Sequence, residues 1–188
     1  MRIAQMFSPV HSLGPGDRVC LWTQGCKKNC KGCISPEMQP ELEIDVNINI
    51  LKELLCGAAR KGNCSGITIS GGDPLEQPDE LLDLLKLIRN EFENILVYTG
   101  FTLEEIEDGV AGKSAVLCLK YIDVLIDGRY IDEENVPDAI LRGSMNQQIH
   151  YLNPVCRNEY EEYMKKGRVI EPFFHDGKIV FTGILNRD

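Results

Sequence analysis

The feature that most restricts the fold of this chain is an alternation of short apolar runs with segments of helical period. Four runs read as β-strands, at residues 18–22 (RVCLW), 66–70 (GITIS), 95–98 (ILVY) and 123–126 (DVLI). Between them, apolar residues recur at helical spacing, most clearly at Leu81, Leu84, Leu85, Ile88 and Phe92, after a helix start at Pro78 and Asp79. Strands that alternate with helices predict β/α units around a parallel sheet.

Two weaker helical signals and a hairpin complete the predicted fold. A shorter stripe consists of Leu51, Leu54, Leu55 and Ala58, and the segment TLEEIEDG at 102–109 begins like a capped helix. The tail at 169–185 reads as two strands joined at Asp176 and Gly177. The predicted fold class is therefore α/β, an incomplete parallel (β/α) barrel with a short C-terminal β hairpin. We expect a single domain over residues 1–188.

The composition indicates a globular chain, and the absence of export and membrane signals indicates a reducing compartment. The sequence holds eight cysteines, no run of eighteen apolar residues and no signal-peptide pattern at its N-terminus. We therefore expect a cytoplasmic location, in which cysteines serve as ligands or core residues and form no disulfide framework. The net charge of −9 argues against nucleic-acid and membrane partners. A local basic patch at Lys27, Lys28 and Lys31 is compatible with that charge.

Polar or glycine-rich segments follow all four predicted strands. TQGCKKNCKGC follows the first strand, GGDP the second, TGF the third and DGR the fourth. The carboxyl ends of parallel strands meet at one edge of a sheet, where ligands bind. The sequence thus predicts one composite site at this edge.

Cys26, Cys30 and Cys33 stand at spacing C-x3-C-x2-C, which indicates a metal site with three thiolates. The segment between Cys26 and Cys33 (KKNCKG) is polar, so it would pack poorly in a hydrophobic core. A zinc site needs a fourth ligand, for which the candidates are Cys20, Cys56 and Cys64. A [4Fe–4S] cluster, whose irons are usually each held by a cysteine, would keep one iron open to a small molecule. Thiolates serve both metals, and we favour iron–sulfur over zinc.

The spacing of the three cysteines resembles the hallmark of the radical SAM superfamily. GGDP, at 71–74, resembles the glycine-rich motif of that superfamily, since two glycines let the backbone approach a ligand closely. GPGDRVCLWTQGC, SGGDPLEQ, VYTGF, IDVLIDGRY, LRGSMNQQI and FTGIL are similar, in that order, to segments of the activating enzymes for glycyl radical enzymes. The anaerobic ribonucleotide reductase activating proteins match best, over most of the chain. One departure is Cys33-Ile34-Ser35-Pro36, where activases commonly read C-H-N-P.

The resemblance implies a radical SAM oxidoreductase with a barrel of radical SAM type. In that superfamily the amino and carboxylate groups of S-adenosylmethionine (SAM) chelate the open iron of the cluster. Reductive cleavage then gives methionine and a 5′-deoxyadenosyl radical, which abstracts hydrogen from a substrate. For this chain the implied partners are a glycyl radical enzyme as substrate and an electron donor such as flavodoxin or ferredoxin.

The resemblance also implies roles for single residues. Cys26, Cys30 and Cys33 would hold the cluster. Gly32 and Ile34 would lie beside the adenine of SAM, and Gly71, Gly72 and Asp73 would contact its methionine end. Thr99 would either reach the ribose or carboxylate of SAM or cap the helix at TLEE. No residue is assigned as the catalytic one.

Further polar residues follow the fourth predicted strand. Asp127 and Arg129 resemble the Asp-x-Lys segment of pyruvate formate-lyase activases, which borders the cofactor carboxylate and the substrate peptide; a plain turn is the alternative. Arg142, Ser144 and Asn146 are polar candidates without an assigned role.

Other chemistry-bearing residues are not expected at the site. His11, His150 and His175 are scattered, and Cys56 and Cys118 read as core residues. Two alternative functions stay open: a radical SAM modifier of a peptide or small molecule, and a noncatalytic zinc or iron–sulfur interaction module.

Overall fold

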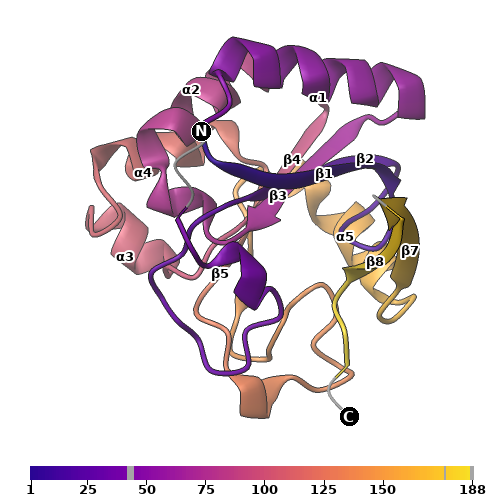
Figure 1. Ribbon diagram of the computed structural model, residues 1–188. Helices are drawn as coiled ribbons and strands as arrows, with labels where there is room; N and C mark the ends of the chain where they lie inside the picture. Colours follow the sequence, from indigo (N-terminus) through magenta and orange to yellow (C-terminus); the bar gives the residue numbers. More distant parts are fainter. Residues whose placement is uncertain (42–44, 176, 187–188) are drawn as a thin grey trace.

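A six-stranded mixed sheet runs through the middle of the protein (Figure 1). The structure is a computed structural model that describes residues 1–41, 45–175 and 177–186. The strands are neighbours in chain order: β1 (Ile3–Val10), β2 (Arg18–Thr23), β3 (Gly66–Gly71), β4 (Asn94–Tyr98), β5 (Val124–Asp127) and β6 (Gln148–Tyr151). β2 to β5 are parallel, whereas β1 and β6 pair antiparallel at the two edges. The α/β class and the parallel sheet predicted from the sequence are confirmed.

The two antiparallel edge strands were not among the predicted strands. β1 mixes polar and apolar residues, and the four residues of β6 (QIHY) are polar or half-buried. Each edge strand pairs with only one neighbour, so it lacks the continuous apolar run that a strand inside the sheet requires. Neither edge strand has the continuous apolar run from which the other four strands were predicted.

Helices cover one face of the sheet. α1 (Ile48–Gly62), α2 (Pro78–Ile88) and α4 (Lys113–Cys118) pack their apolar side chains against those of the central strands, and α3 (Leu103–Glu107) lies beside α4. On the other face, Tyr160 and Tyr163 of α5 (Arg157–Met164) pack against β4 and β5. Short 3-10 turns lie between these elements: η1 (Pro36–Met38), η2 (Pro74–Glu76), η3 (Leu119–Tyr121), η4 (Asp132–Glu134) and η5 (Pro154–Cys156).

The predicted helices are present, with one error in their packing. α2 begins at Pro78 as predicted, and its apolar stripe is buried, although Phe92 lies beyond its end. Thr102 caps α3 through a capping box with Glu105. In α1, however, Leu54 is 52% exposed, because the buried face is built on Leu51, Leu55, Cys56 and Ala59. No helix of the described residues combines the length and the hydropathy needed to cross a bilayer.

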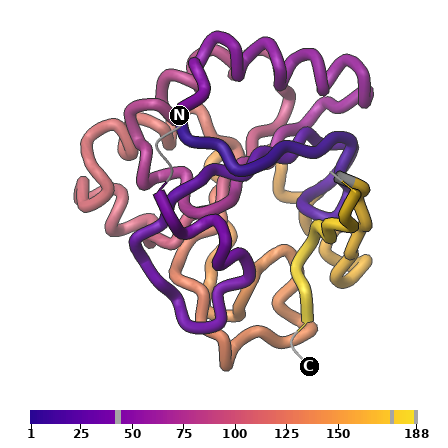
Figure 2. The backbone as a smooth tube through the Cα atoms, in the orientation of Figure 1, coloured from indigo at the N-terminus to yellow at the C-terminus, as the bar shows by residue number. Residues whose placement is uncertain are grey.

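The C-terminal hairpin is confirmed as β7 (Ile170–His175) paired antiparallel with β8 (Lys178–Gly183). Asp176, half of the predicted turn, lies outside the described residues. The hairpin packs beside the N-terminal strands, so the two ends of the colour scale meet in Figure 2. Phe173 of β7 stacks on Phe7 of β1, with ring centroids 4.9 Å apart.

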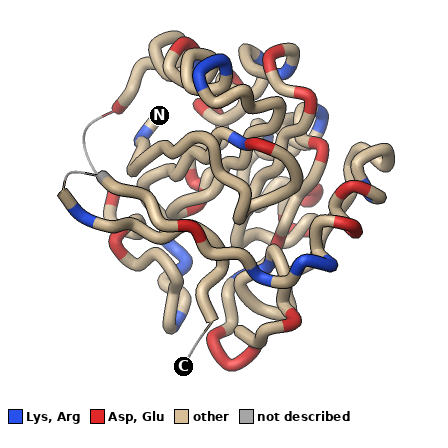
Figure 3. Tube along the Cα trace, turned by 90° about the vertical axis from the view of Figure 1, so that its right-hand side faces the viewer, with Lys and Arg blue, Asp and Glu red and all other residues tan. Residues whose placement is uncertain are grey.

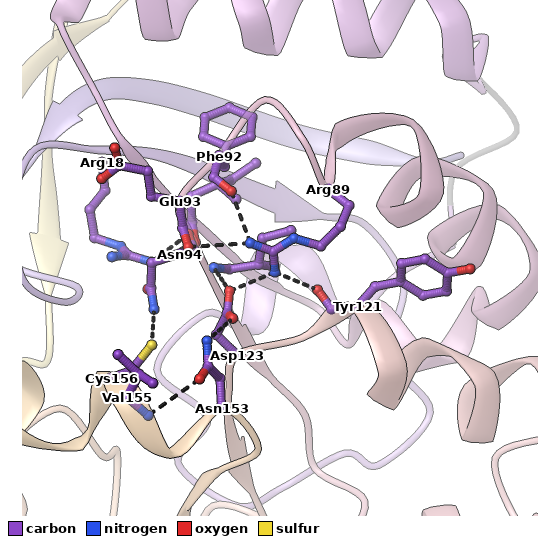
Figure 4. Close-up of polar contacts among 12 residues, drawn as sticks. Arg18, Arg89, Phe92, Glu93, Asn94, Tyr121, Asp123, Asn153, Val155 and Cys156 are labelled. Atoms are coloured by element: carbon purple, nitrogen blue, oxygen red, sulfur yellow. Dashed lines mark hydrogen bonds and ion pairs between the residues drawn. The ribbon is translucent and has the colours of Figure 1, made fainter.

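Arg18 joins the amino ends of three strands through a buried guanidinium, and Figure 4 shows it beside Asn94. It donates to the hydroxyl of Thr68 at 2.7 Å, to the carbonyl of Ile67 at 2.6 Å and to the side-chain oxygen of Asn94 at 2.9 Å. Its third nitrogen donates to the carbonyl of Pro15 at 3.1 Å. Arg18 thus holds β2, β3 and β4 in register at their amino ends. The loops that carry the candidate residues lie at the opposite, carboxyl ends of these strands.

The hydrogen-bond network at the amino ends of the strands also includes residues next to β5 and in α5. Asn94 accepts a hydrogen bond from Tyr160 at 2.6 Å and donates one to the sulfur of Cys156 at 3.1 Å. Asp123, just before β5, accepts from Arg89 at 2.6 Å (Figure 4). Buried polar networks of this kind stabilise a fold only when their members are paired, and these members are.

We predict that Arg18→Met lowers the free energy of unfolding by about 3 kcal/mol, because several buried acceptors at the strand starts lose their donor. Denaturant unfolding measures the loss. Arg60→Met, at an exposed position on α1, is the control and should change the free energy by less than about 0.5 kcal/mol. A loss below about 1 kcal/mol for Arg18→Met would show that the network contributes little.

Candidate functional site

A cavity of about 410 Å³ opens at the carboxyl ends of the parallel strands. Its wall is built from the loops that follow β2, β3, β4 and β5, together with the C-terminal hairpin. Most of the residues proposed from the sequence line it: Cys26, Cys30, Cys33, Ile34, Gly71, Gly72, Asp73 and Thr99. The four segments predicted to meet at this end of the strands therefore line one cavity.

The loop that carries the three cysteines is fixed to its neighbours by backbone hydrogen bonds. Cys26 donates its N–H to the carbonyl of Gln39 at 2.9 Å, and Gly25 donates to Met38 at 2.8 Å. The carbonyl of Gly25 in turn accepts from the N–H of Asp73 at 3.0 Å. Because of these bonds, the cysteine loop and the GGDP loop form one wall.

The three thiols are free and half-buried on this wall. Burial raises the pKa of the Cys26 thiol, although a backbone hydrogen bond and the ammonium of Lys28 act in the opposite direction. Three thiols on one cavity wall fit an iron–sulfur cluster, whose protein ligands are cysteine thiolates. Within residues 1–41, 45–175 and 177–186, no three histidine, cysteine, aspartate or glutamate side chains form a group that could hold a single metal ion.

The cysteines considered as a fourth zinc ligand lie elsewhere. Cys20 is buried within β2, beside Phe7 and Trp22, and burial raises its pKa to about 12. Cys56 and Cys64 line a separate depression at the amino ends of β2 and β3, with Asp17 and Glu91. The core roles expected for Cys56 and Cys118 agree with their exposures of 3% and 0%.

Lys28 connects the cysteine loop to two other loops. Its ammonium lies 2.8 Å from the carboxylate of Asp73 and 3.0 Å from that of Glu76, and its side chain is 6% exposed. The same ammonium lies 3.4 Å from the ring centroid of Phe101, on the loop after β4. Burial by itself lowers the pKa of Lys28, but the two carboxylates outweigh burial and raise it above the ordinary value. Lys28 is therefore a buried ion-pair partner and does not belong to an exposed basic patch, which the net charge had left open.

Asp73 is the acceptor on which these loops converge. Its buried carboxylate accepts hydrogen bonds from the hydroxyl of Thr99 at 2.9 Å, the N–H of Gly100 at 2.9 Å and the N–H of Leu75 at 2.9 Å. The cap position of the following helix belongs to Thr102, so the interpretation of Thr99 as a helix cap is wrong. Thr99 instead ties the loop after β4 to the GGDP loop.

The two glycines of GGDP are required by close backbone contacts. A Cβ on Gly71 would overlap the backbone of Thr23, and the φ angle of Gly71 is +118°. A Cβ on Gly72 would overlap the carbonyl oxygens of Gly25 and Met38. A larger residue at Gly72 would consequently push the cysteine loop off the GGDP loop before it reached any ligand.

The remaining candidates divide between the cavity and its surroundings. Ile34 lines the cavity. Gly32 lies beside Asp132, with whose carboxylate a Cβ would clash. Asp127 and Arg129 line a neighbouring depression of about 550 Å³, which shares Gly100 and Gly128 with the cavity. The structure therefore brings Asp127 and Arg129 to an adjoining surface and not to the wall that carries the cysteines.

Asp127 has partners of its own in that depression. Its carboxylate accepts from the N–H of Leu103 and lies 3.0 Å from the imidazole of His150. Arg129 is exposed. His150 was not expected at the site, since an isolated histidine carries no signal in the sequence.

The RGSMN segment supports the loop after β5. Asn146 donates to the carbonyl of Arg129 at 2.8 Å, and Ser144 accepts from the N–H of Ile131 at 3.1 Å. Gln147, which the sequence did not single out, donates to the carbonyl of Gly128 at 2.8 Å and lines the cavity. These contacts give the segment a positioning role, and Arg142 joins it through the carbonyl of Gln147 at 3.2 Å.

Comparisons with known proteins place the chain in an iron–sulfur family. Residues 12–150 match the family model described as 4Fe-4S single cluster domain. The anaerobic ribonucleoside-triphosphate reductase-activating protein of Vibrio cholerae is 32% identical in an alignment 154 residues long, which covers 73% of this chain and 89% of that protein. The protein of the same name from Enterobacteria phage T4 is 34% identical over 142 residues, covering 72% of this chain and 85% of that protein.

Among solved structures, QueE from Escherichia coli aligns with 53% of this chain and 52% of its own, at 24% identity and a TM-score of 0.42. The two reductase-activating proteins align with a larger share of this chain than QueE does. With a family model over most of its length and relatives above 30% identity, the chain belongs to the radical SAM family of anaerobic ribonucleoside-triphosphate reductase-activating proteins.

Proposed function

We propose that this protein cleaves SAM reductively at a [4Fe–4S] cluster and installs a glycyl radical on an anaerobic ribonucleoside-triphosphate reductase. The names of the relatives and the 4Fe-4S family model support this function. The observation that carries it is that three free thiols and a glycine-rich loop line the same cavity of about 410 Å³.

Different residues of the cavity have different roles in this proposal. Cys26, Cys30 and Cys33 are the proposed cluster ligands, and the backbone of Gly71 and Gly72 is the proposed contact for the methionine end of SAM. When bound, the cluster supplies the electron that breaks the C5′–S bond of SAM. The role of the protein is to hold these groups in place and to keep water away from the radical that results.

The acceptor in this proposal is a glycine on a loop of the partner protein. SAM, when bound, would supply the 5′-deoxyadenosyl group that accepts the Cα hydrogen as 5′-deoxyadenosine, and the unpaired electron would stay on the glycine. Arg129 is exposed beside the cavity, and its guanidinium has several donors for the backbone carbonyls of an incoming peptide.

Several finer features belong to the same proposal. We infer one radical SAM domain over residues 1–188, with the four parallel strands as part of an incomplete barrel. A flavodoxin or ferredoxin is the proposed electron donor, because the electron has to come from outside the chain. The cytoplasmic location stays a prediction from the sequence.

The cluster ligands are tested by metal content. After anaerobic reconstitution the protein should hold about four irons per chain, and Cys30→Ala should hold almost none. Cys118→Ala, which alters a cysteine buried in α4, should keep the iron of the wild-type protein. Iron and acid-labile sulfide analysis measures both. A reconstituted wild-type protein that holds zinc and no sulfide would contradict the assignment.

The role of Lys28 is tested by SAM binding. Lys28→Met should lower the free energy of unfolding by about 3 kcal/mol, because it leaves the buried carboxylate of Asp73 without its cation. It should also weaken SAM binding roughly tenfold or about 1.4 kcal/mol, because the GGDP loop loses its tie to the cysteine loop. Equilibrium dialysis of the reconstituted protein measures the affinity.

Lys31→Met is the matched control, since Lys31 lies in the same loop but is 81% exposed. Its iron content and SAM affinity should equal those of the wild-type protein. Lys28→Arg, which keeps the charge, should restore part of the affinity. If Lys28→Met bound SAM as tightly as the wild-type protein at equal iron content, the tie would be unimportant for the site.

Arg129→Ala should separate radical transfer from SAM cleavage. We expect the yield of glycyl radical on the reductase to fall roughly tenfold, while 5′-deoxyadenosine formation without the reductase stays within about twofold. The EPR signal of the glycyl radical and chromatography of 5′-deoxyadenosine are the two measurements. Equal losses in both would make Arg129 a residue of the SAM site.

A further inference from the structure

The outer face of the C-terminal hairpin carries exposed apolar side chains. Directly opposed residues of an antiparallel pair point to the same face, and the register opposes Pro172 to Phe181 and Phe174 to Ile179. Phe174 is 81% exposed, Phe181 59% and Ile179 53%. We name the apolar residues of this face the hairpin stripe: Ile170, Pro172, Phe174, Ile179 and Phe181. Contiguous apolar surface of this kind marks interaction sites.

The opposite face fixes the hairpin to the rest of the protein. The carboxylate of Glu171 accepts the backbone N–H groups of His11 at 2.8 Å and Ser12 at 2.6 Å, and the hydroxyls of Thr182 and Ser12 lie 3.0 Å apart. Val180 and Phe173 pack into the cluster around Phe7 and Trp22. The stripe is therefore presented by an anchored element at the front of the view in Figure 3.

The stripe is continuous with the rim of the cavity. Phe181 belongs to the stripe and also lines the cavity, and Ile184 and Leu185 line it directly after β8. The cysteine thiols lie on another wall of the same cavity. A molecule that covers the hairpin stripe thus touches Phe181, which also lines the cavity.

We propose that the hairpin stripe is the docking face for the protein that receives the radical, a proposal that rests on the function proposed above. That protein has to bring a glycine loop into the cavity, and the stripe gives its surface beside the loop an apolar, aromatic contact. The occupant of the stripe is accordingly the reductase, through an apolar patch next to its glycine loop.

The test uses the anaerobic ribonucleoside-triphosphate reductase of the same organism as the probe. The double variant Phe174→Ser with Ile179→Ser changes two exposed side chains that do not line the cavity. We expect its dissociation constant for the reductase, measured by sedimentation, to rise roughly tenfold or more. Glycyl radical yield at limiting concentration should fall in parallel, and 5′-deoxyadenosine formation without the reductase should be unchanged.

Two further variants make the result interpretable. Phe174→Gln alone should show a smaller loss in the same direction, which separates docking from misfolding of the double variant. Val155→Ser alters a residue that is 86% exposed outside the hairpin, and it should bind the reductase like the wild-type protein.

Each outcome decides between the two proposals. Wild-type affinity and radical yield in the double variant would overturn the docking proposal and leave the proposed function intact. So would a double variant that only loses self-association, since the stripe would then bind a second copy. A wild-type protein that cleaves SAM but produces no radical on the reductase would overturn the proposed function, and the docking proposal with it.

Discussion

The buried ion pair of Lys28 with Asp73 is the interaction on which the arrangement of the site depends. It joins the cysteine loop, the GGDP loop and the loop after β4 at one point, since Asp73 also accepts from Thr99 and Gly100. Breaking a buried pair by removing one partner costs far more than an exposed pair contributes. The ion pair thus fixes the three loops relative to one another. As a result, the thiols and the glycine backbone are held at defined positions in the cavity.

The two ends of the parallel strands have different roles. At the amino ends of the strands, Arg18 and Asn94 tie β2, β3, β4 and α5 together through buried hydrogen bonds. At the carboxyl ends, the loops carry thiols, glycines and exposed charges around a cavity. This separation is expected for a parallel sheet, in which function resides at the carboxyl ends and stability at the opposite edge. Substitutions at Arg18 should therefore act on folding, and those at the loops on chemistry.

Much of this was predictable from the sequence, because the strongest signals are local. The four parallel strands follow from apolar runs, and the start of α2 follows from Pro78 and Asp79. The gathering of the cysteines, GGDP and Thr99 in one cavity follows from their positions after successive strands. Edge strands β1 and β6 were missed because pairing on one side leaves only a weak pattern.

What could not be predicted depends on contacts between distant residues. Lys28 reads as one of three similar lysines, and only the fold shows that it is buried on Asp73 whereas Lys31 is exposed. The closeness of Gly72 to the carbonyl of Gly25, and of His150 to Asp127, are likewise tertiary facts. The placement of Asp127 and Arg129 beside the cavity depends on the path of the backbone after β5.

The central claim is that the three thiols hold a cluster to which SAM binds directly. EPR spectroscopy of the anaerobically reconstituted and reduced protein, recorded before and after addition of SAM, tests it most directly. The account predicts the signal of a reduced [4Fe–4S] cluster, whose g values shift when SAM binds at the iron that lacks a protein ligand. A protein without such a signal, or a cluster signal that SAM leaves unchanged, would contradict it.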